Sequence, residues 1–158
     1  MDITWITPQL GLGGGIWNDA KMAQVADAGI THVINLQTEF DDRPLAERYG
    51  IEVLWNATDD DFQPKSAEFL KRGVDFALDA IKVKKNKIFI HCAAGVHRAP
   101  MMTLAVMGAM GYDLRQSQTT IQRLRPVVDW AAVYVASVEK FIRDYDRVAE
   151  SKWLPVAP

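Results

Sequence analysis

Short apolar runs separated by polar segments predict five strands along the chain. The runs lie at 3–6, 10–12, 31–36, 51–55 and 88–90. The last run, Ile88-Phe89-Ile90, is continuously apolar and leads directly into polar His91. A run of this kind is typical of a strand at the centre of a parallel sheet that is covered on both faces.

Longer segments with apolar residues three or four positions apart predict the helices. Ser66 fits an N-cap, and the apolar positions that follow it keep helical spacing: Phe69, Leu70, Val74, Leu78 and Ile81. Similar patterns predict helices from Asn18 or Asp19 to Ala28, and over 99–110 and 113–124. A last helix is predicted from near Asp129 to about Arg147, with an irregular tail over 153–158.

Strands alternate with helices in the first two-thirds of the chain, and helices dominate the rest. This order predicts one α/β domain over residues 1–158, with three layers and a central, mostly parallel twisted sheet flanked by helices. We interpret the polar stretches 41–44 and 56–65 as loops, and Gly13-Gly14-Gly15 as a tight turn that needs positive φ. Trp5, Trp17 and Trp55 are expected in the core.

Composition narrows the class of protein further. Of 158 residues, 49% are hydrophobic and 24% are charged, which indicates a globular domain with a sizeable core. The 18 basic and 20 acidic residues leave a net charge of −2, so neither nucleic acid nor a membrane is an expected partner. The chain has neither an apolar run long enough for a membrane span nor the start of a secretion signal, so we expect a cytoplasmic location.

A single cysteine, Cys92, is the feature that points to chemistry. It has no partner for an internal disulfide or a cysteine metal cluster, and His32 has no partner at ligand spacing, so no metal or cofactor is expected. Cys92 follows the apolar strand and precedes an almost wholly apolar helix. Its simplest interpretation is a small buried hydrophobic residue at a strand end.

The residues after Cys92 favour a catalytic interpretation instead. The loop 93–98 can turn its N–H groups inward as an anion nest, which Gly95 and the N-terminus of the next helix assist. Arg98 can fold back over this nest, because its planar fork suits two oxygens of a phosphate. The same field favours the thiolate of Cys92, which is a nucleophile for phosphorus.

The sequence His91-Cys92-x-x-Gly95-x-x-Arg98 resembles the signature of the cysteine-dependent protein tyrosine phosphatase superfamily. The size and the order of elements resemble its compact, atypical dual-specificity branch. Segment 30–36 looks like the strand early in that domain, and segment 123–126 looks like the Arg-Pro segment late in it. The resemblance implies that Cys92 forms a phosphocysteine and that His91 supports the loop without contacting substrate. It also implies phosphate binding by loop residues, namely Ala93, Ala94, Gly95, Val96, His97 and Arg98.

The resemblance also implies a general acid about thirty residues upstream, where the chain has three aspartates in a row. An alignment without gaps through residues 69–76 favours Asp60. The local pattern Asp61-Phe62-Gln63-Pro64 resembles another common form of the loop and favours Asp61. We therefore rank Asp60 first, Asp61 close behind it and Asp59 third.

One position departs from the family pattern, because Ala99 stands where most members have Ser or Thr after the arginine. This change could slow breakdown of the phosphoenzyme. The run from Ala94 to Pro100 also resembles the plant glucan phosphatases. The alternatives to a tyrosine or dual-specificity phosphatase are therefore a glucan or other non-protein phosphatase, or a phosphate-binding pseudophosphatase.

The variable loop positions bear on the substrate. The loop carries no lysine, so a highly phosphorylated ligand is disfavoured. The expected partner is a phosphorylated protein or a small phosphomonoester, with a phosphoglucan as a further candidate. His97 is expected either to contact substrate or to point to solvent. Phe62 and Trp130 are candidates for the rim of the pocket or for core packing.

Overall fold

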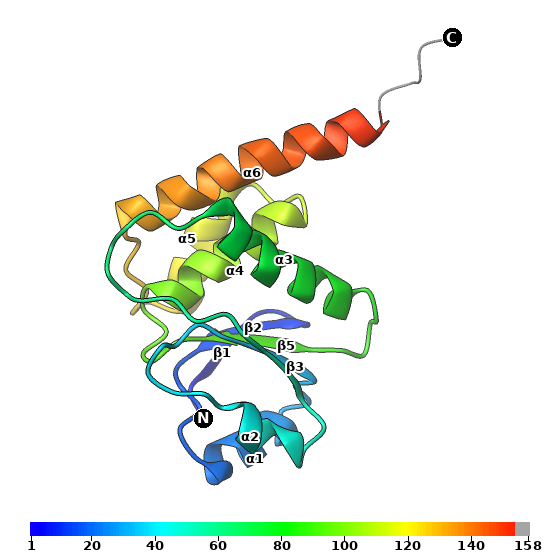
Figure 1. Cartoon of the computed structure of the whole chain (residues 1–158), viewed down its shortest axis with the longest axis vertical. Coiled ribbons are helices and arrows are strands. Elements are labelled where there is room, and N and C mark those ends of the chain that lie inside the picture. The colour runs from blue at the N-terminus through cyan, green and yellow to red at the C-terminus, as the bar shows by residue number, and fades with distance from the viewer. Residues whose placement is uncertain (154–158) are drawn as a thin grey trace.

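The computed structural model describes the backbone of residues 1–153 and the side chains of residues 1–146. A five-stranded sheet lies at the centre of the fold, between two layers of helices (Figure 1). The strands in order across the sheet are β1 (Ile3–Thr7), β2 (Leu10–Gly13), β5 (Ile88–His91), β3 (His32–Asn35) and β4 (Glu52–Trp55). Only the β1–β2 pair is antiparallel among these described strands. The predicted three-layer α/β fold is confirmed.

The two faces of the sheet carry different helices. Figure 1 shows α1 (Asp19–Asp27) and α2 (Arg43–Glu47) on one face. The other face carries α3 (Ala67–Ile81), α4 (Arg98–Ala109), α5 (Leu114–Leu124) and α6 (Ala132–Trp153). In β5, Ile88 and Ile90 pack in the larger core cluster with α3 and α4, and Phe89 packs in the smaller cluster with α1. This two-residue period explains why the strand is continuously apolar.

Three predicted helix starts are confirmed by their capping hydrogen bonds. The side chains of Asn18, Ser66 and Asp113 accept from the backbone N–H three residues later, at 2.9, 3.1 and 2.9 Å. Each bond satisfies one of the N–H groups that have no partner in the first turn of a helix.

Two helices differ from the sequence prediction. The stretch that contains Pro44 was expected as a loop but forms α2, whose five residues are too few to show a helical pattern. The last helix begins at Ala132, three residues later than expected, and the N–H of Asp129 donates to the carbonyl of Val96 (3.1 Å). It extends to Trp153, beyond the expected end at Arg147. The rest of the predicted tail, 154–158, lies outside the described residues.

The Gly13–Gly15 segment is not the predicted turn, since none of its three residues has positive φ. Close packing accounts for two of these glycines, since a Cβ at Gly13 would overlap the carbonyl oxygen of Asp2 and one at Gly15 would lie 2.6 Å from the ring of Trp17. The N–H of Gly15 donates to the carbonyl of Ala93 (3.0 Å). The segment therefore lies directly against the loop that follows β5.

The tryptophan prediction is corrected as well. Trp17 is 41% exposed and contacts the ring of Phe40, with ring centroids 5.7 Å apart. Trp5 and Trp55 are half-buried and do not reach the centre of the core.

Candidate active site

The loop from Cys92 to His97 joins the central strand β5 to the buried helix α4. Cys92 is 3% exposed, and its Sγ accepts a hydrogen bond from the N–H of Gly95 at 3.3 Å. Gly95 has φ 68°, which a side chain would strain. The loop thus turns at least one N–H toward the sulfur.

Arg98 is the first residue of α4, and its side chain is almost fully buried beside the loop. Its Nη1 and Nη2 donate to the two carboxylate oxygens of Glu39 at 2.7 and 2.8 Å, and Nη1 also donates to the carbonyl of Thr58 at 3.0 Å. Among the described residues, buried Nε has no hydrogen-bond partner. The edge formed by Nε and Nη2 is therefore left for two oxygens of a phosphate.

The hydrogen bonds between Glu39 and Arg98 also favour the charged form of both side chains. These hydrogen bonds hold the pKa of Glu39 at about 2, below the ordinary 4.5. The same contact raises the pKa of Arg98. Sequence reasoning missed Glu39, because it lies in a polar segment with no motif and 59 residues before Arg98.

His91 lies behind the loop and is fully buried with its partner Asp42. Its Nε2 lies 2.7 Å from Oδ2 of Asp42, and its Nδ1 lies 3.3 Å from the carbonyl of Cys92. This burial keeps the ring away from the mouth of the site, as expected for a residue that supports the loop. Asp42 was not singled out in the sequence.

Arg125 holds the loop from its outer side. Its Nε donates to the carbonyl of Gly95 at 2.9 Å, and its Nη2 donates to the carbonyl of Ala94 at 3.1 Å. Asp2 binds the other side of the guanidinium, which lowers the pKa of Asp2. Because the two carbonyls face outward to Arg125, the N–H groups of the following residues, Gly95 and Val96, face the opposite way.

The three aspartates of the 56–66 loop lie in different surroundings. Oδ2 of Asp60 lies 2.9 Å from Nδ1 of His97, so Asp60 is brought to the loop that follows β5. Asp61 instead pairs with Lys65 at 2.8 Å, and this hydrogen bond lowers its pKa. Asp59 contributes a backbone carbonyl to the same Lys65.

His97 neither points freely to solvent nor leaves a ring nitrogen open for a substrate. Its Nδ1 contacts Asp60, and its Nε2 lies 3.1 Å from Oδ2 of Asp129. Phe62 is 49% exposed with φ 55° and packs its ring against that of His97, with centroids 5.0 Å apart. This position agrees with the interpretation of Phe62 as a residue at the rim of the pocket. Trp130 instead packs against the larger core cluster, the other position expected for it, and lines a separate depression with residues of α5.

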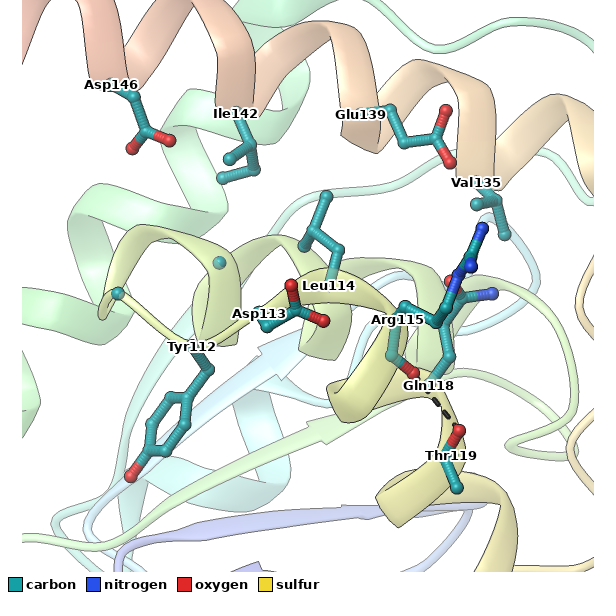
Figure 2. Close-up of a pocket in the computed structure, with 12 residues that line it drawn as sticks. Tyr112, Asp113, Leu114, Arg115, Gln118, Thr119, Val135, Glu139, Ile142 and Asp146 are labelled. Atoms are coloured by element: carbon teal, nitrogen blue, oxygen red, sulfur yellow. Dashed lines mark hydrogen bonds between the residues drawn. The ribbon is translucent and has the colours of Figure 1, made fainter.

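A cavity of about 890 Å³ lies away from this loop (Figure 2). The cavity lies at the C-terminal end of α4 and is lined mainly by α5 and α6. Its lining residues include Leu114, Arg115, Glu139 and Ile142. The 12 residues of α4 place it about 18 Å along that helix from the loop, at 1.5 Å per residue. None of the predicted site residues lines it.

In the part of the chain that the structure describes, no three His, Cys, Asp or Glu side chains form a group that could hold a metal ion. No helix in this part of the chain is long and apolar enough to cross a membrane.

Known proteins resemble this chain in sequence. The sequence model of the family "Dual specificity phosphatase, catalytic domain" matches residues 15–143. Protein phosphatase Slingshot homolog 3 of Mus musculus is 31% identical over 127 residues, which are 78% of this chain but only 18% of the mouse protein. The 123R protein of Invertebrate iridescent virus 6, named as a tyrosine phosphatase, is 26% identical over 144 residues, covering 90% of this chain and 94% of the viral protein.

Solved structures share the fold. The structure of PTPMT1 in complex with PI(5)P has a TM-score of 0.82 at 19% identity and covers 93% of this chain and 98% of its own. The structure of DUSP15 has a TM-score of 0.76 at 22% identity and covers 97% of both chains. At sequence identities of 19% and 22%, the structural similarity supports the shared fold alone.

Proposed function

The chain belongs to the dual specificity phosphatase catalytic domain family, and we propose that residues 1–158 form one catalytic domain that acts through a phosphocysteine on Cys92. Enzymes of this class are cysteine-dependent phosphatases and act on phosphorylated substrates. This assignment rests on the combination of a buried thiol, that of Cys92, with an arginine, Arg98, whose Nε has no hydrogen-bond partner among the described residues.

In the first step the loop binds the phosphate and Cys92 attacks it. N–H groups of residues 93–98 and the Nε edge of Arg98 bind the phosphate oxygens, and they stabilise the charge that grows on them. The Cys92 thiolate forms a bond to phosphorus while the bond from phosphorus to the leaving oxygen breaks. Asp60 gives its proton to that oxygen.

In the second step water hydrolyses the phosphocysteine. Asp60 accepts a proton from the attacking water, the S–P bond breaks, and the thiolate and phosphate are released. His91 and Arg125 keep the loop in shape through both steps, because their contacts lie on its outer side.

Phosphotyrosine in proteins is the favoured substrate, with phosphoserine and phosphothreonine as further ones. The exposed ring of Phe62 beside the loop offers an aromatic surface for a phenyl group. Acidic side chains, Asp60 and Asp129, surround His97 at the same mouth and disfavour ligands with several phosphates. We further propose a cytoplasmic location, since a lone catalytic thiolate works only where it stays reduced.

Hydrolysis of p-nitrophenyl phosphate by the wild type and by Cys92→Ser tests the reaction. We expect the wild type to be faster than Cys92→Ser by orders of magnitude. Equal rates would instead indicate a pseudophosphatase that binds phosphate without hydrolysing the ester. Asp60→Asn and Asp61→Asn, compared at several pH values, test the general acid. Loss of the basic limb of the pH profile only in Asp61→Asn would reverse our assignment.

A substrate panel tests the proposed class. Phosphotyrosine and phosphoserine peptides, phosphoinositides and a phosphorylated glucan are compared by kcat/KM at equal ionic strength. We expect phosphotyrosine peptides to be hydrolysed fastest. A preference for the glucan or for a phosphoinositide would replace the protein substrate with a non-protein one.

A further inference from the structure

His97 connects three parts of the site that are far apart in the sequence. Its ring lies between Asp60 of the 56–66 loop (Nδ1 to Oδ2, 2.9 Å) and Asp129 of the segment that joins α5 to α6 (Nε2 to Oδ2, 3.1 Å). The backbone of Asp129 is itself fixed to the phosphate-binding loop, since its N–H donates to the carbonyl of Val96 at 3.1 Å. The ring is 21% exposed, so protein groups surround most of it.

We propose that His97, oriented by Asp129, is a positioning residue that holds Asp60 beside the phosphate-binding loop and shares with it the proton that Asp60 delivers to the leaving oxygen. This proposal rests on the phosphatase function proposed above. It adds a role for two residues that the general mechanism does not require.

The hydrogen-bond pattern supports a shared proton. The carboxylate of Asp129 can only accept, so Nε2 carries a hydrogen. Nδ1 and the facing oxygen of Asp60 then need one more proton between them, carried either by Nδ1 or by Oδ2. Without it, two lone pairs would face each other at 2.9 Å. The contact therefore persists whichever partner carries the proton.

The charged and titratable groups around the ring favour this proton. Burial alone would lower the pKa of His97, but the hydrogen bonds with Asp129 and Asp60 outweigh it and raise the pKa. Tyr134 of α6 donates to Oδ1 of Asp60 at 3.0 Å. Burial raises the pKa of Tyr134 to about 12, so this donor keeps its hydrogen. Arg98, the residue next to His97, is bound to the carboxylate of Glu39 and also attracts the charge of Asp60.

Asp60 and His97 together lose one proton in the first step and regain one in the second. In the first step the leaving oxygen takes the shared proton, and the pair of Asp60 and neutral His97 is left without it. In the second step the attacking water returns a proton to the pair as its hydroxide joins phosphorus. The pair thus loses and regains one proton in each turnover, and Nε2 keeps its hydrogen toward Asp129 throughout.

Two substrates that differ in leaving group separate this role from damage to the loop. Phenyl phosphate has a poor leaving group and needs the acid, whereas difluoromethylumbelliferyl phosphate has a good one. For His97→Ala we expect kcat on phenyl phosphate to fall about 100-fold, near the lower end of what a general acid contributes. On the second substrate kcat should change less than threefold, about 0.6 kcal/mol.

A conservative variant separates position from proton sharing. The amide of His97→Asn can donate to Asp60 from the place of Nδ1 but has no titratable proton to share with it. It should recover part of kcat on phenyl phosphate, while the basic limb of its pH profile moves to lower pH. His32→Asn is the matched control, because His32 pairs with Glu52 at the other end of the sheet, and we expect it to leave both substrates unchanged.

Three outcomes would overturn the proposal. These are equal losses on both substrates, an unshifted basic limb in His97→Asn, and a double variant His97→Ala/Asp60→Asn that is much slower than Asp60→Asn alone. Inhibition by inorganic phosphate checks that the loop stays folded in each variant. A wild type no faster than Cys92→Ser would instead reject the phosphatase function itself, so the two failures are distinguishable.

Discussion

Glu39 binds both terminal nitrogens of Arg98 and leaves the Nε edge of the guanidinium open. The contacts of 2.7 and 2.8 Å fix the plane of the guanidinium, and the carbonyl of Thr58 takes another hydrogen of Nη1. A phosphate that enters the loop therefore meets an arginine whose orientation is already set. Such preorganisation reduces the free energy needed to order charged groups during the reaction.

Glu39→Gln tests this relationship, because it keeps the shape of the side chain and removes its charge. We expect kcat/KM to fall about tenfold, since charge-assisted hydrogen bonds contribute roughly 1.5–3 kcal/mol and the amide retains part of them. The measurement is steady-state hydrolysis of p-nitrophenyl phosphate together with inhibition by phosphate. Asp19→Asn is the control, as it breaks the exposed ion pair with Arg48 and should change neither value. Unchanged kinetics of Glu39→Gln would show that the loop alone orients Arg98.

The low pKa of Glu39 predicts how this pair depends on pH. Its hydrogen bonds with Arg98 put the pKa at about 2 in the folded chain, below the ordinary 4.5. A carboxyl whose pKa is lowered on folding stabilises the fold fully above the ordinary value, and this contribution is lost as the pH falls through the folded-state value. The difference in Tm between wild type and Glu39→Gln should therefore shrink from about pH 5 to about pH 2. A difference that is constant over this range would contradict the pairing.

Gly95→Ala and Gly50→Ala distinguish two reasons why a position requires glycine, namely a positive φ and close contact with neighbouring atoms. Both residues have positive φ, 68° and 66°, where an alanine costs about 1–2 kcal/mol. A Cβ at Gly50 would meet nothing within 4 Å, whereas one at Gly95 would lie 2.5 Å from Nη2 of Arg125 and 2.7 Å from the backbone of Gly13.

We expect Gly50→Ala to lower Tm modestly and to leave kcat unchanged. Gly95→Ala should lower Tm further and should reduce kcat about 100-fold, because a displacement of about 1 Å in the loop misplaces its donors. Thermal denaturation and p-nitrophenyl phosphate hydrolysis measure both effects. Equal results for the two variants would mean that Arg125 and Gly13 yield to the added methyl group.

The parts of the fold that follow local rules could be predicted from the sequence. Ile88-Phe89-Ile90 is apolar on both faces because β5 lies at the centre of the sheet, and Ser66 begins a helix because its hydroxyl accepts from Phe69. The loop from Cys92 to Arg98 is also local, so its motif survives in a single sequence. Periodicity and capping need only near neighbours, which is why these predictions succeed.

Other residues of the site could not be predicted, because their partners lie far along the chain. Glu39 meets Arg98 across 59 residues, and Asp2 meets Arg125 across 123. Glu39 lies in a polar stretch without periodicity and Asp2 directly before the first strand, and at both places an ionic side chain is ordinarily solvated. Among the three adjacent aspartates, only the fold distinguishes Asp60 beside His97 from Asp61 beside Lys65.

Ala99 is fully buried in the first turn of α4, next to Arg98. The resemblance to the family implies a hydroxyl at this place, which would support the sulfur as it leaves phosphorus. In the described residues the hydrogen bond that reaches Sγ of Cys92 comes from the N–H of Gly95 at 3.3 Å. If breakdown of the phosphocysteine limits turnover, Ala99→Ser should raise kcat and reduce the burst of p-nitrophenol at the start of the reaction.

Ala105→Ser is the matched control for Ala99→Ser, since Ala105 is also fully buried in α4 but lies two turns from the loop. Both variants bury a hydroxyl, which can bond to a carbonyl one turn earlier, as Thr103 does with Ala99 at 2.8 Å. Their shared loss of Tm therefore measures the cost of the hydroxyl, and only Ala99→Ser should change the burst. A burst of the same size in both would show that the N–H of Gly95 already supports the leaving thiolate, and that the alanine has no effect on turnover.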